Sequence, residues 1–278
     1  MLKRTITGIF IVAVVVGFFF LRKADVRLFA VLIYFLSLAG TFEVFRAVNR
    51  VSGEGEKAPF SGGSGKFSLA AEIVCAAAFT PVFVFCGPLW ALAVLGCGVI
   101  ALAAAEIVSP AGAKAFGARA LVLLYPNAFL FCMLAVNAME EHSLQALLLI
   151  FVTSPLSDTL AYLVGSLIGG KKLCPKISPN KTVSGAVGGL FGGAVGALAL
   201  HFIFPSVFGV RAEWLLFLVI GLAAAFFTEA GDLFESYIKR RAGIKDMGRL
   251  LPGHGGIMDR IDGILFCSAF TAAVFCFL

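Results

Sequence analysis

The sequence predicts an all-α, polytopic integral membrane protein with about nine transmembrane helices. Its 278 residues are 60% hydrophobic and only 14% charged, and the mean hydropathy is +1.00. A soluble domain is nearer half apolar and a quarter charged. The apolar residues also gather in runs of about 17–25, the length that a helix needs to cross a bilayer. Together these observations exclude an ordinary soluble domain.

The expected spans are residues 5–21, 26–45, 68–87, 89–108, 120–137, 144–168, 183–204, 213–238 and 257–277. The first run is longer than the apolar segment of a usual signal peptide, and no small-residue cleavage site follows it, so we expect it to be retained as a helix. Residues 52–66 are rich in Gly and Ser and are expected to form a flexible loop.

The basic residues predict the orientation. With the N-terminus in the cytoplasm, only four of the 22 Lys and Arg residues fall on the other side of the membrane, as the positive-inside rule requires. These four are Arg22, Lys23, Arg27 and Arg211. Both long polar loops, 169–182 and 239–256, then lie in the cytoplasm. The bias explains the net charge of +6 without a nucleic-acid partner. A short N-terminus without an amphipathic Arg- and Ser-rich segment favours a bacterial inner (plasma) membrane.

The seventh run carries two stripes of glycine at four-residue spacing. The stripes are Gly185, Gly189 and Gly193, and Gly188, Gly192 and Gly196. Small residues at this spacing let helix backbones approach closely in lipid, so we expect tight helix packing here.

The eighth run ends in a polar face. Glu229, Asp232, Ser236 and Lys239 recur at spacings of three, four and three, which places them on one side of a helix. This face begins inside the membrane and emerges toward the cytoplasm. A carboxylate at membrane depth is costly and usually faces a water-filled cavity or a cation.

Two further aspartates, Asp259 and Asp262, open the ninth run three residues apart. The helix dipole would account for one acid at this position, but it does not account for three aspartates gathered at one cytoplasmic mouth. Carboxylate oxygens are the ligands that Mg²⁺ prefers, together with water and substrate phosphates. Asp232, Asp259 and Asp262 are therefore the candidate metal ligands.

Both polar loops are suited to phosphate. Loop 239–256 has five bases between Lys239 and Pro252, followed by glycines around His254 that let a backbone close around a phosphate. Loop 169–182 has four lysines, with Ser178, Asn180 and Thr182 as hydrogen-bonding groups, and it lacks the P-loop pattern. Acids for a metal and bases for phosphates at the bilayer surface indicate phosphoryl or nucleotidyl transfer involving a lipid.

Six short motifs carry a resemblance to a known family. They are "SYIKR" at 236–240, "KD" at 245–246 and "PGHGGIMDRID" at 252–262, preceded by "DTLAY" at 158–162, "ISPNKT" at 177–182 and "GDLFES" at 231–236. The chain resembles the phosphatidate cytidylyltransferases, or CDP-diacylglycerol synthases, densely over about residues 155–265. Leu160 and Val183 stand where that family usually has Gly and Trp.

The resemblance implies an all-helical enzyme, often a dimer, that converts CTP and phosphatidate into CDP-diacylglycerol and pyrophosphate with Mg²⁺, alone or with a second cation. Residues 1–137 are then helices for packing and for lipid or dimer contacts, and residues 138–278 form the catalytic region. The implied catalytic residues are Asp232, Lys239, Arg240, Lys245, His254, Asp259 and Asp262, of which the three aspartates serve the metal. The implied substrate-binding residues are Asp158, Ser178, Lys181, Thr182, Ser236, Gly255 and Gly256.

Two alternatives stay open at this point. A CTP-dependent lipid kinase of the polyprenol or phytol type would transfer a γ-phosphoryl group to an alcohol, although the "PGHGG…DRID" run speaks against it. A cation-coupled transporter would use the acids as an ion path, but transport sites usually lie near the membrane midplane.

Overall fold

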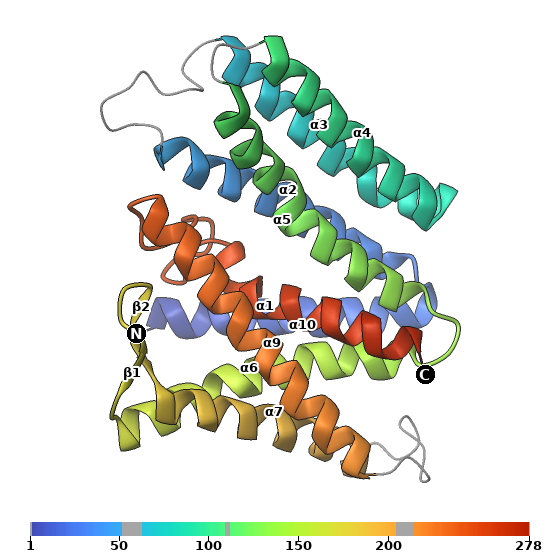
Figure 1. Ribbon diagram of the computed structural model, residues 1–278. Coiled ribbons are helices and arrows are strands. Elements are labelled where there is room, and N and C mark those ends of the chain that lie inside the picture. Colours follow the sequence, from blue (N-terminus) through green and yellow to red (C-terminus); the bar gives the residue numbers. More distant parts are fainter. Residues whose placement is uncertain (1, 52–62, 109–111, 204–213, 278) are drawn as a thin grey trace. The chain divides into compact units, whose positions relative to one another are not determined.

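The computed structural model describes residues 2–51, 63–108, 112–203 and 214–277. In these ranges the chain forms nine helices and two short strands (Figure 1). The helices are α1 (Leu2–Ala24), α2 (Leu28–Val51), α3 (Gly63–Cys86), α4 (Pro88–Val108), α5 (Gly112–Ala138), α6 (Ser143–Ile168), α7 (Val183–Ile203), α9 (Trp214–Arg241) and α10 (Met258–Cys276). The strands are β1 (Lys172–Cys174) and β2 (Ser178–Thr182).

Eight of these nine described helices are long and apolar enough to cross a membrane. This confirms the prediction of an all-α, polytopic integral membrane protein. The exception is α10, the ninth expected span, whose first five residues include Asp259, Arg260 and Asp262. Of the loop predicted at 52–66, residues 52–62 lie outside the described part, and residues 63–66 form the first turn of α3 instead.

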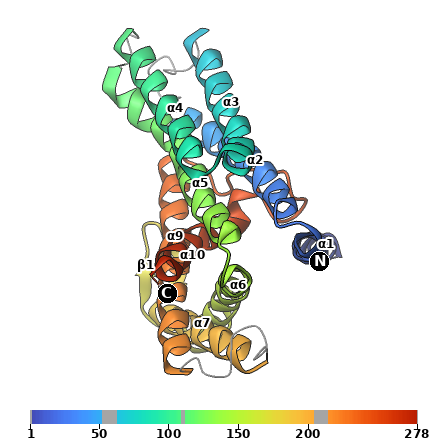
Figure 2. The ribbon, with the colours of Figure 1, turned by 90° about the vertical axis from the view of Figure 1, so that its right-hand side faces the viewer.

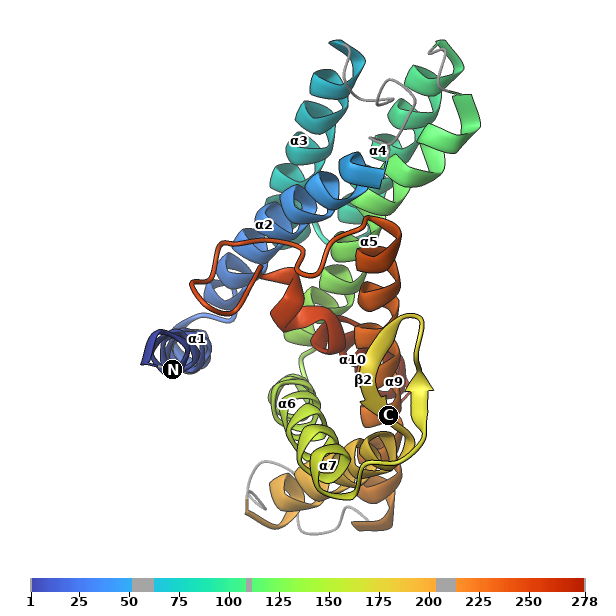
Figure 3. The ribbon, with the colours of Figure 1, turned by 90° about the vertical axis from the view of Figure 1, so that its left-hand side faces the viewer.

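The loop at 169–182 contains secondary structure that the sequence analysis did not predict. β1 and β2 pair antiparallel, with Lys172 opposite Thr182 and Cys174 opposite Ser178 (Figure 3). The turn between them carries Pro175 and closes with a hydrogen bond from the N–H of Ile177 to the carbonyl of Cys174 at 3.1 Å. The lysines of this loop therefore stand on a small hairpin that leads directly into α7.

The chain divides into two compact units, 1–134 with 238–260, and 135–237 with 261–278. In the first unit α1 packs on α2, α2 on α3, and α3 on α4 (Figure 2). A buried amide ties this unit together, because Asn127 of α5 accepts from the hydroxyl of Ser37 at 2.5 Å and donates to that of Thr41 at 3.0 Å. Polar side chains buried between membrane helices have no water to bind, so they need such partners within the protein.

The second unit is built on a close contact between α6 and α7. A Cβ on Gly188 would lie 2.5 Å from Cβ of Val164, and a Cβ on Gly192 would lie 2.7 Å from the carbonyl oxygen of Leu156. In the other stripe, Gly193 meets α9, since a Cβ on this residue would lie 2.5 Å from the carbonyl oxygen of Gly221. The predicted role of the glycine stripes in tight packing is confirmed.

Candidate functional site

The predicted site residues divide evenly between the two units, with seven in each. The second unit holds Asp158, Ser178, Lys181, Thr182, Asp232, Ser236 and Asp262. The first unit holds Lys239, Arg240, Lys245, His254, Gly255, Gly256 and Asp259. Both α9 and α10 contribute residues to each group.

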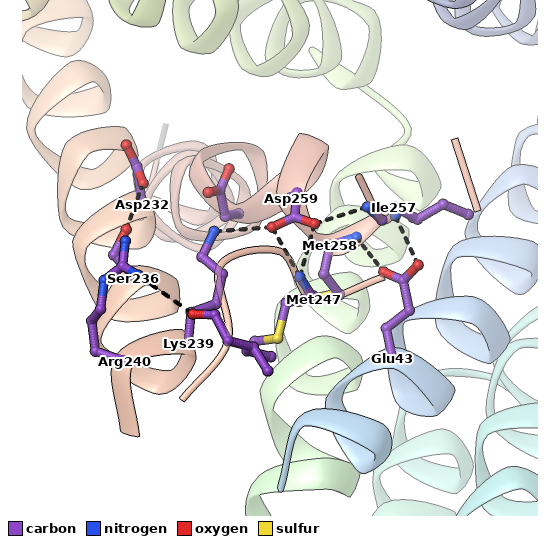
Figure 4. Close-up of polar contacts among 12 residues, drawn as sticks. Glu43, Asp232, Ser236, Lys239, Arg240, Met247, Ile257, Met258 and Asp259 are labelled. Atoms are coloured by element: carbon purple, nitrogen blue, oxygen red, sulfur yellow. Dashed lines mark hydrogen bonds and ion pairs between the residues drawn. The ribbon is translucent and has the colours of Figure 1, made fainter. Parts of the chain in front are cut away.

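Asp232, in α9, is held by two donors of the second unit. Nζ of Lys181, in β2, lies 2.8 Å from Oδ2 of Asp232. The hydroxyl of Ser236, one turn further along α9, donates to Oδ1 at 3.2 Å (Figure 4). The side chains of Lys181 and Asp232 remain 21% and 31% exposed. The hairpin thus presents a cation beside a carboxylate that solvent can still reach.

Two glycines, Gly231 and Gly263, allow α9 and α10 to pack closely where Asp232 and Asp262 lie. A Cβ on Gly231 would lie 2.5 Å from the carbonyl oxygen of Asp262, and a Cβ on Gly263 would lie 2.6 Å from Cγ2 of Thr228. Each glycine adjoins one of the two aspartates in the sequence. The close crossing of α9 and α10 that these glycines permit therefore places Asp232 and Asp262 near each other.

Two further acids of the second unit face the same group. Asp158, on α6, interacts electrostatically with Lys181, Asp232 and Asp262. Glu229 also lies within that range of Asp158. It is only 8% exposed, and its Oε1 has no hydrogen-bond partner among the described residues. Lys181 interacts with three of these acids, Asp158, Glu229 and Asp232.

Thr182 and Ser178 have structural surroundings in the hairpin. The hydroxyl of Thr182 accepts the backbone N–H of Gly185 at 3.1 Å, so it caps the N-terminus of α7. Thr182 is buried, whereas Ser178 at the start of β2 is half-buried. The structure therefore gives Thr182 a capping role that the sequence analysis did not foresee.

Asp259, at the start of α10, is the best-connected acid of the first unit. Nζ of Lys239 lies 3.0 Å from Oδ1, and the backbone N–H groups of Met247 and Gly256 donate to Oδ2 at 2.9 and 2.8 Å (Figure 4). The side chains of Lys239 and Asp259 are 11% and 3% exposed. Three donors on one buried carboxylate stabilise its charged form.

The glycine-rich segment of the first unit forms a tight turn beside an open pocket of about 690 Å³. The N–H of His254 donates to the carbonyl of Leu251 at 2.9 Å, and the N–H of Leu251 donates to that of Gly255 at 2.9 Å. Gly253 and Gly255 have φ of 79° and 87°, which side chains rarely adopt. The charged and titratable residues that line the pocket are Lys245, Asp246, Arg249, His254 and Arg260. A pocket with this excess of bases suits an anion.

Glu43, in α2, is not among the site residues predicted from the sequence. Its Oε1 accepts the N–H of Ile257 at 3.1 Å and its Oε2 accepts that of Met258 at 2.9 Å, so it binds the chain where α10 begins (Figure 4). Glu43 is only 2% exposed. A signal was present, because Glu43 is an acid inside the second apolar run, and such residues are functional candidates by default.

The carboxylates of the two units differ in their fitness for Mg²⁺. No three His, Cys, Asp or Glu side chains converge as a metal site within the described ranges, but Mg²⁺ needs only one or two protein carboxylates beside water and phosphate. Asp232, partly exposed and near Asp262 and Asp158, fits such a role. Asp259 fits it only if Lys239 withdraws, because its two oxygens already accept three N–H donors.

Comparison with known proteins agrees with these features. Proteins named phosphatidate cytidylyltransferase are 46% identical over 127 residues in Staphylococcus aureus (strain COL), 49% over 127 residues in Staphylococcus saprophyticus and 39% over 132 residues in Brucella abortus. Each match covers 46–47% of this chain and 46–47% of the relative, so the matched segment spans about half the length of these curated relatives. A family model described as the cytidylyltransferase family matches residues 2–278. The chain therefore belongs to the cytidylyltransferase family.

Proposed function

We propose that this protein is a phosphatidate cytidylyltransferase, which makes CDP-diacylglycerol and pyrophosphate from CTP and phosphatidate in phospholipid biosynthesis. The observation that carries the proposal is the basic, glycine-lined pocket at 245–260, in a chain that also carries membrane-embedded acids and is matched over residues 2–278 by the cytidylyltransferase family. The names of the relatives from Staphylococcus and Brucella support the choice of lipid substrate.

In the proposed reaction a phosphate oxygen of phosphatidate forms a bond to the α-phosphorus of CTP. The bond from that phosphorus to the oxygen bridging the α- and β-phosphates breaks, and pyrophosphate leaves with the electron pair. The attacking oxygen is already anionic near neutral pH, so the step needs charge neutralisation and positioning more than a strong base.

The proposed residue roles follow the two groups. In the first unit, Lys239, Arg240, Lys245 and His254 neutralise phosphates, and the backbone at Gly255 and Gly256 approaches them. In the second unit, Ser178, Lys181 and Thr182 bind the nucleotide, with Asp158 and Ser236 as supporting polar groups. Asp232, Asp259 and Asp262 serve Mg²⁺, which would neutralise charge on the phosphates when bound; a second cation is also proposed.

The membrane setting completes the proposal. The N-terminus and the active site lie on the cytoplasmic side of the membrane, as the distribution of Lys and Arg predicts. The membrane itself would be a bacterial plasma membrane. A homodimer, implied by the family resemblance, stays a prediction. CTP arrives from the aqueous side, and phosphatidate from the bilayer.

The test uses the purified full chain in mixed micelles containing phosphatidate, with CTP labelled either at the α- or at the γ-phosphorus. The proposal predicts that the α-label enters CDP-diacylglycerol, that the γ-label leaves in pyrophosphate, and that chelation of divalent cations stops both. Transfer of the γ-label to polyprenol or phytol would establish a lipid kinase instead. Cation flux into proteoliposomes without any lipid product would establish a transporter.

A further inference from the structure

Glu43 makes a contact that reaches across almost the whole sequence. Its two carboxylate oxygens accept the N–H groups of consecutive residues, Ile257 and Met258, which lie more than 210 positions further along the chain. Both partners belong to the same compact unit. The contact ties α2 to the segment 247–258, here called the glycine loop, which leads from Met247 through His254 into α10.

Two glycines of the glycine loop form the seat of the Glu43 carboxylate. A Cβ on Gly248 would lie only 2.0 Å from Oε1 of Glu43, and a Cβ on Gly256 would lie 2.4 Å from Oε2. Neither glycine has a positive φ, so backbone conformation does not require glycine at either position. The space that a side chain would take is filled by Glu43.

Glu43 and Asp259 together satisfy four backbone donors of this loop. Asp259 accepts from Met247 and Gly256, and Glu43 accepts from Ile257 and Met258. An ionised carboxylate offers only acceptors, whereas an amide side chain would turn an N–H group toward one of these donors. The loop is therefore held by acids from two different helices.

We propose that Glu43 is a positioning residue, which holds the glycine loop in the shape that presents His254 to the phosphates of the nucleotide and that fixes the loop backbone around Asp259. The proposal rests on the proposed function and extends its machinery into the first 137 residues, which were expected only to pack and to contact lipid or a second copy. Glu43 acts through the loop, because both oxygens of its carboxylate accept backbone N–H groups and the side chain is buried.

The first test compares Glu43→Gln with Glu141→Gln, the same chemical change at a side chain that is 89% exposed. Glu43→Gln should lower turnover of CTP with phosphatidate about 100-fold, since small displacements of phosphate-binding groups have effects of this size. Hydrogen exchange should accelerate about tenfold at the amides of Ile257 and Met258, through loss of a charge-assisted hydrogen bond. Exchange in α3 and α4 should be unchanged, and Glu141→Gln should match the wild type in every respect.

A second test adds a side chain at Gly248, beside the Glu43 carboxylate. Gly248→Ala alone should impair turnover, because its Cβ collides with Glu43. The Glu43→Ala variant should itself have reduced turnover. Adding Gly248→Ala to this variant should lower turnover by less than about a further twofold, because the collision with Glu43 is gone.

Wild-type turnover and exchange in Glu43→Gln would overturn the proposal, as would equally faster exchange throughout α2–α5, or fully additive losses for Gly248→Ala and Glu43→Ala. A wild-type protein inactive on phosphatidate would refute the proposed function alone. In that case the exchange pattern of Glu43→Gln still decides whether Glu43 holds the loop.

Discussion

Nζ of Lys239 lies 3.0 Å from Oδ1 of Asp259, twenty residues further along the chain, and both side chains are almost withdrawn from solvent. The ion pair joins the end of α9 to the start of α10 within the first unit. A buried pair of this kind is costly to break, because either partner alone is an uncompensated charge.

Lys239→Met should therefore reduce the free energy of unfolding by about 3–5 kcal/mol, since Asp259 would lose its counter-charge. Thermal or chemical unfolding in detergent measures the change. Lys245→Met provides the matched control, because Lys245 is exposed and its loss should matter by less than about 0.5 kcal/mol. Equal stability of the two variants would show that the pair contributes nothing.

Asp232→Asn should lower turnover about 100-fold or more, because the amide is a poorer partner for a divalent cation. The fold should persist, since the Lys181–Asp232 pair is partly exposed and such pairs contribute about 1 kcal/mol or less. Activity over a range of Mg²⁺ concentrations, with Asp25→Asn as the control at an exposed acid, measures the effect. Near-normal turnover at every Mg²⁺ concentration would refute the metal role.

Gly188→Ala in α7 should destabilise the protein by about 1–3 kcal/mol, because the added Cβ would lie 2.5 Å from Cβ of Val164 in α6. Gly17→Ala in α1 is the control, since a Cβ there meets nothing within 4 Å. Thermal unfolding of the two variants in one detergent separates a packing effect from a general effect of alanine. Unchanged stability of Gly188→Ala would contradict the close α6–α7 contact.

Thr182→Ala should cost about 1 kcal/mol of stability through loss of the α7 cap, and Thr182→Ser should restore it. Comparing unfolding with the KM for CTP separates the cap from nucleotide binding. If KM rises in Thr182→Ala without any change in stability, the hydroxyl serves the substrate and not the helix.

Hydropathy predicted most of the helical architecture because transmembrane length is a local property of the sequence. It placed the eighth span at 213–238, close to α9. It failed where helices continue beyond their apolar run, as in α5, which begins eight residues before the predicted span at 120. The hairpin of β1 and β2 was not predicted, because short polar strands have no alternating hydrophobic pattern.

The site shows a similar division. Motif spacing named Asp232, Lys239 and Asp259, but their partners depend on tertiary structure. The ion pair of Asp259 with Lys239 and that of Lys181 with Asp232 join separate elements, and no spacing rule specifies them. Glu43 was missed for the same reason, since its partners lie at the other end of the chain.

The long reach of Glu43 has a consequence for biogenesis. A ribosome must synthesise at least 258 residues before both amides that donate to this carboxylate exist. Until then α2 enters the bilayer with an acid lacking its final partners, a costly state for a membrane-embedded charge. Assembly of the first unit must therefore wait for late translation, and chains that stop before α10 should be preferred targets of membrane quality-control proteases.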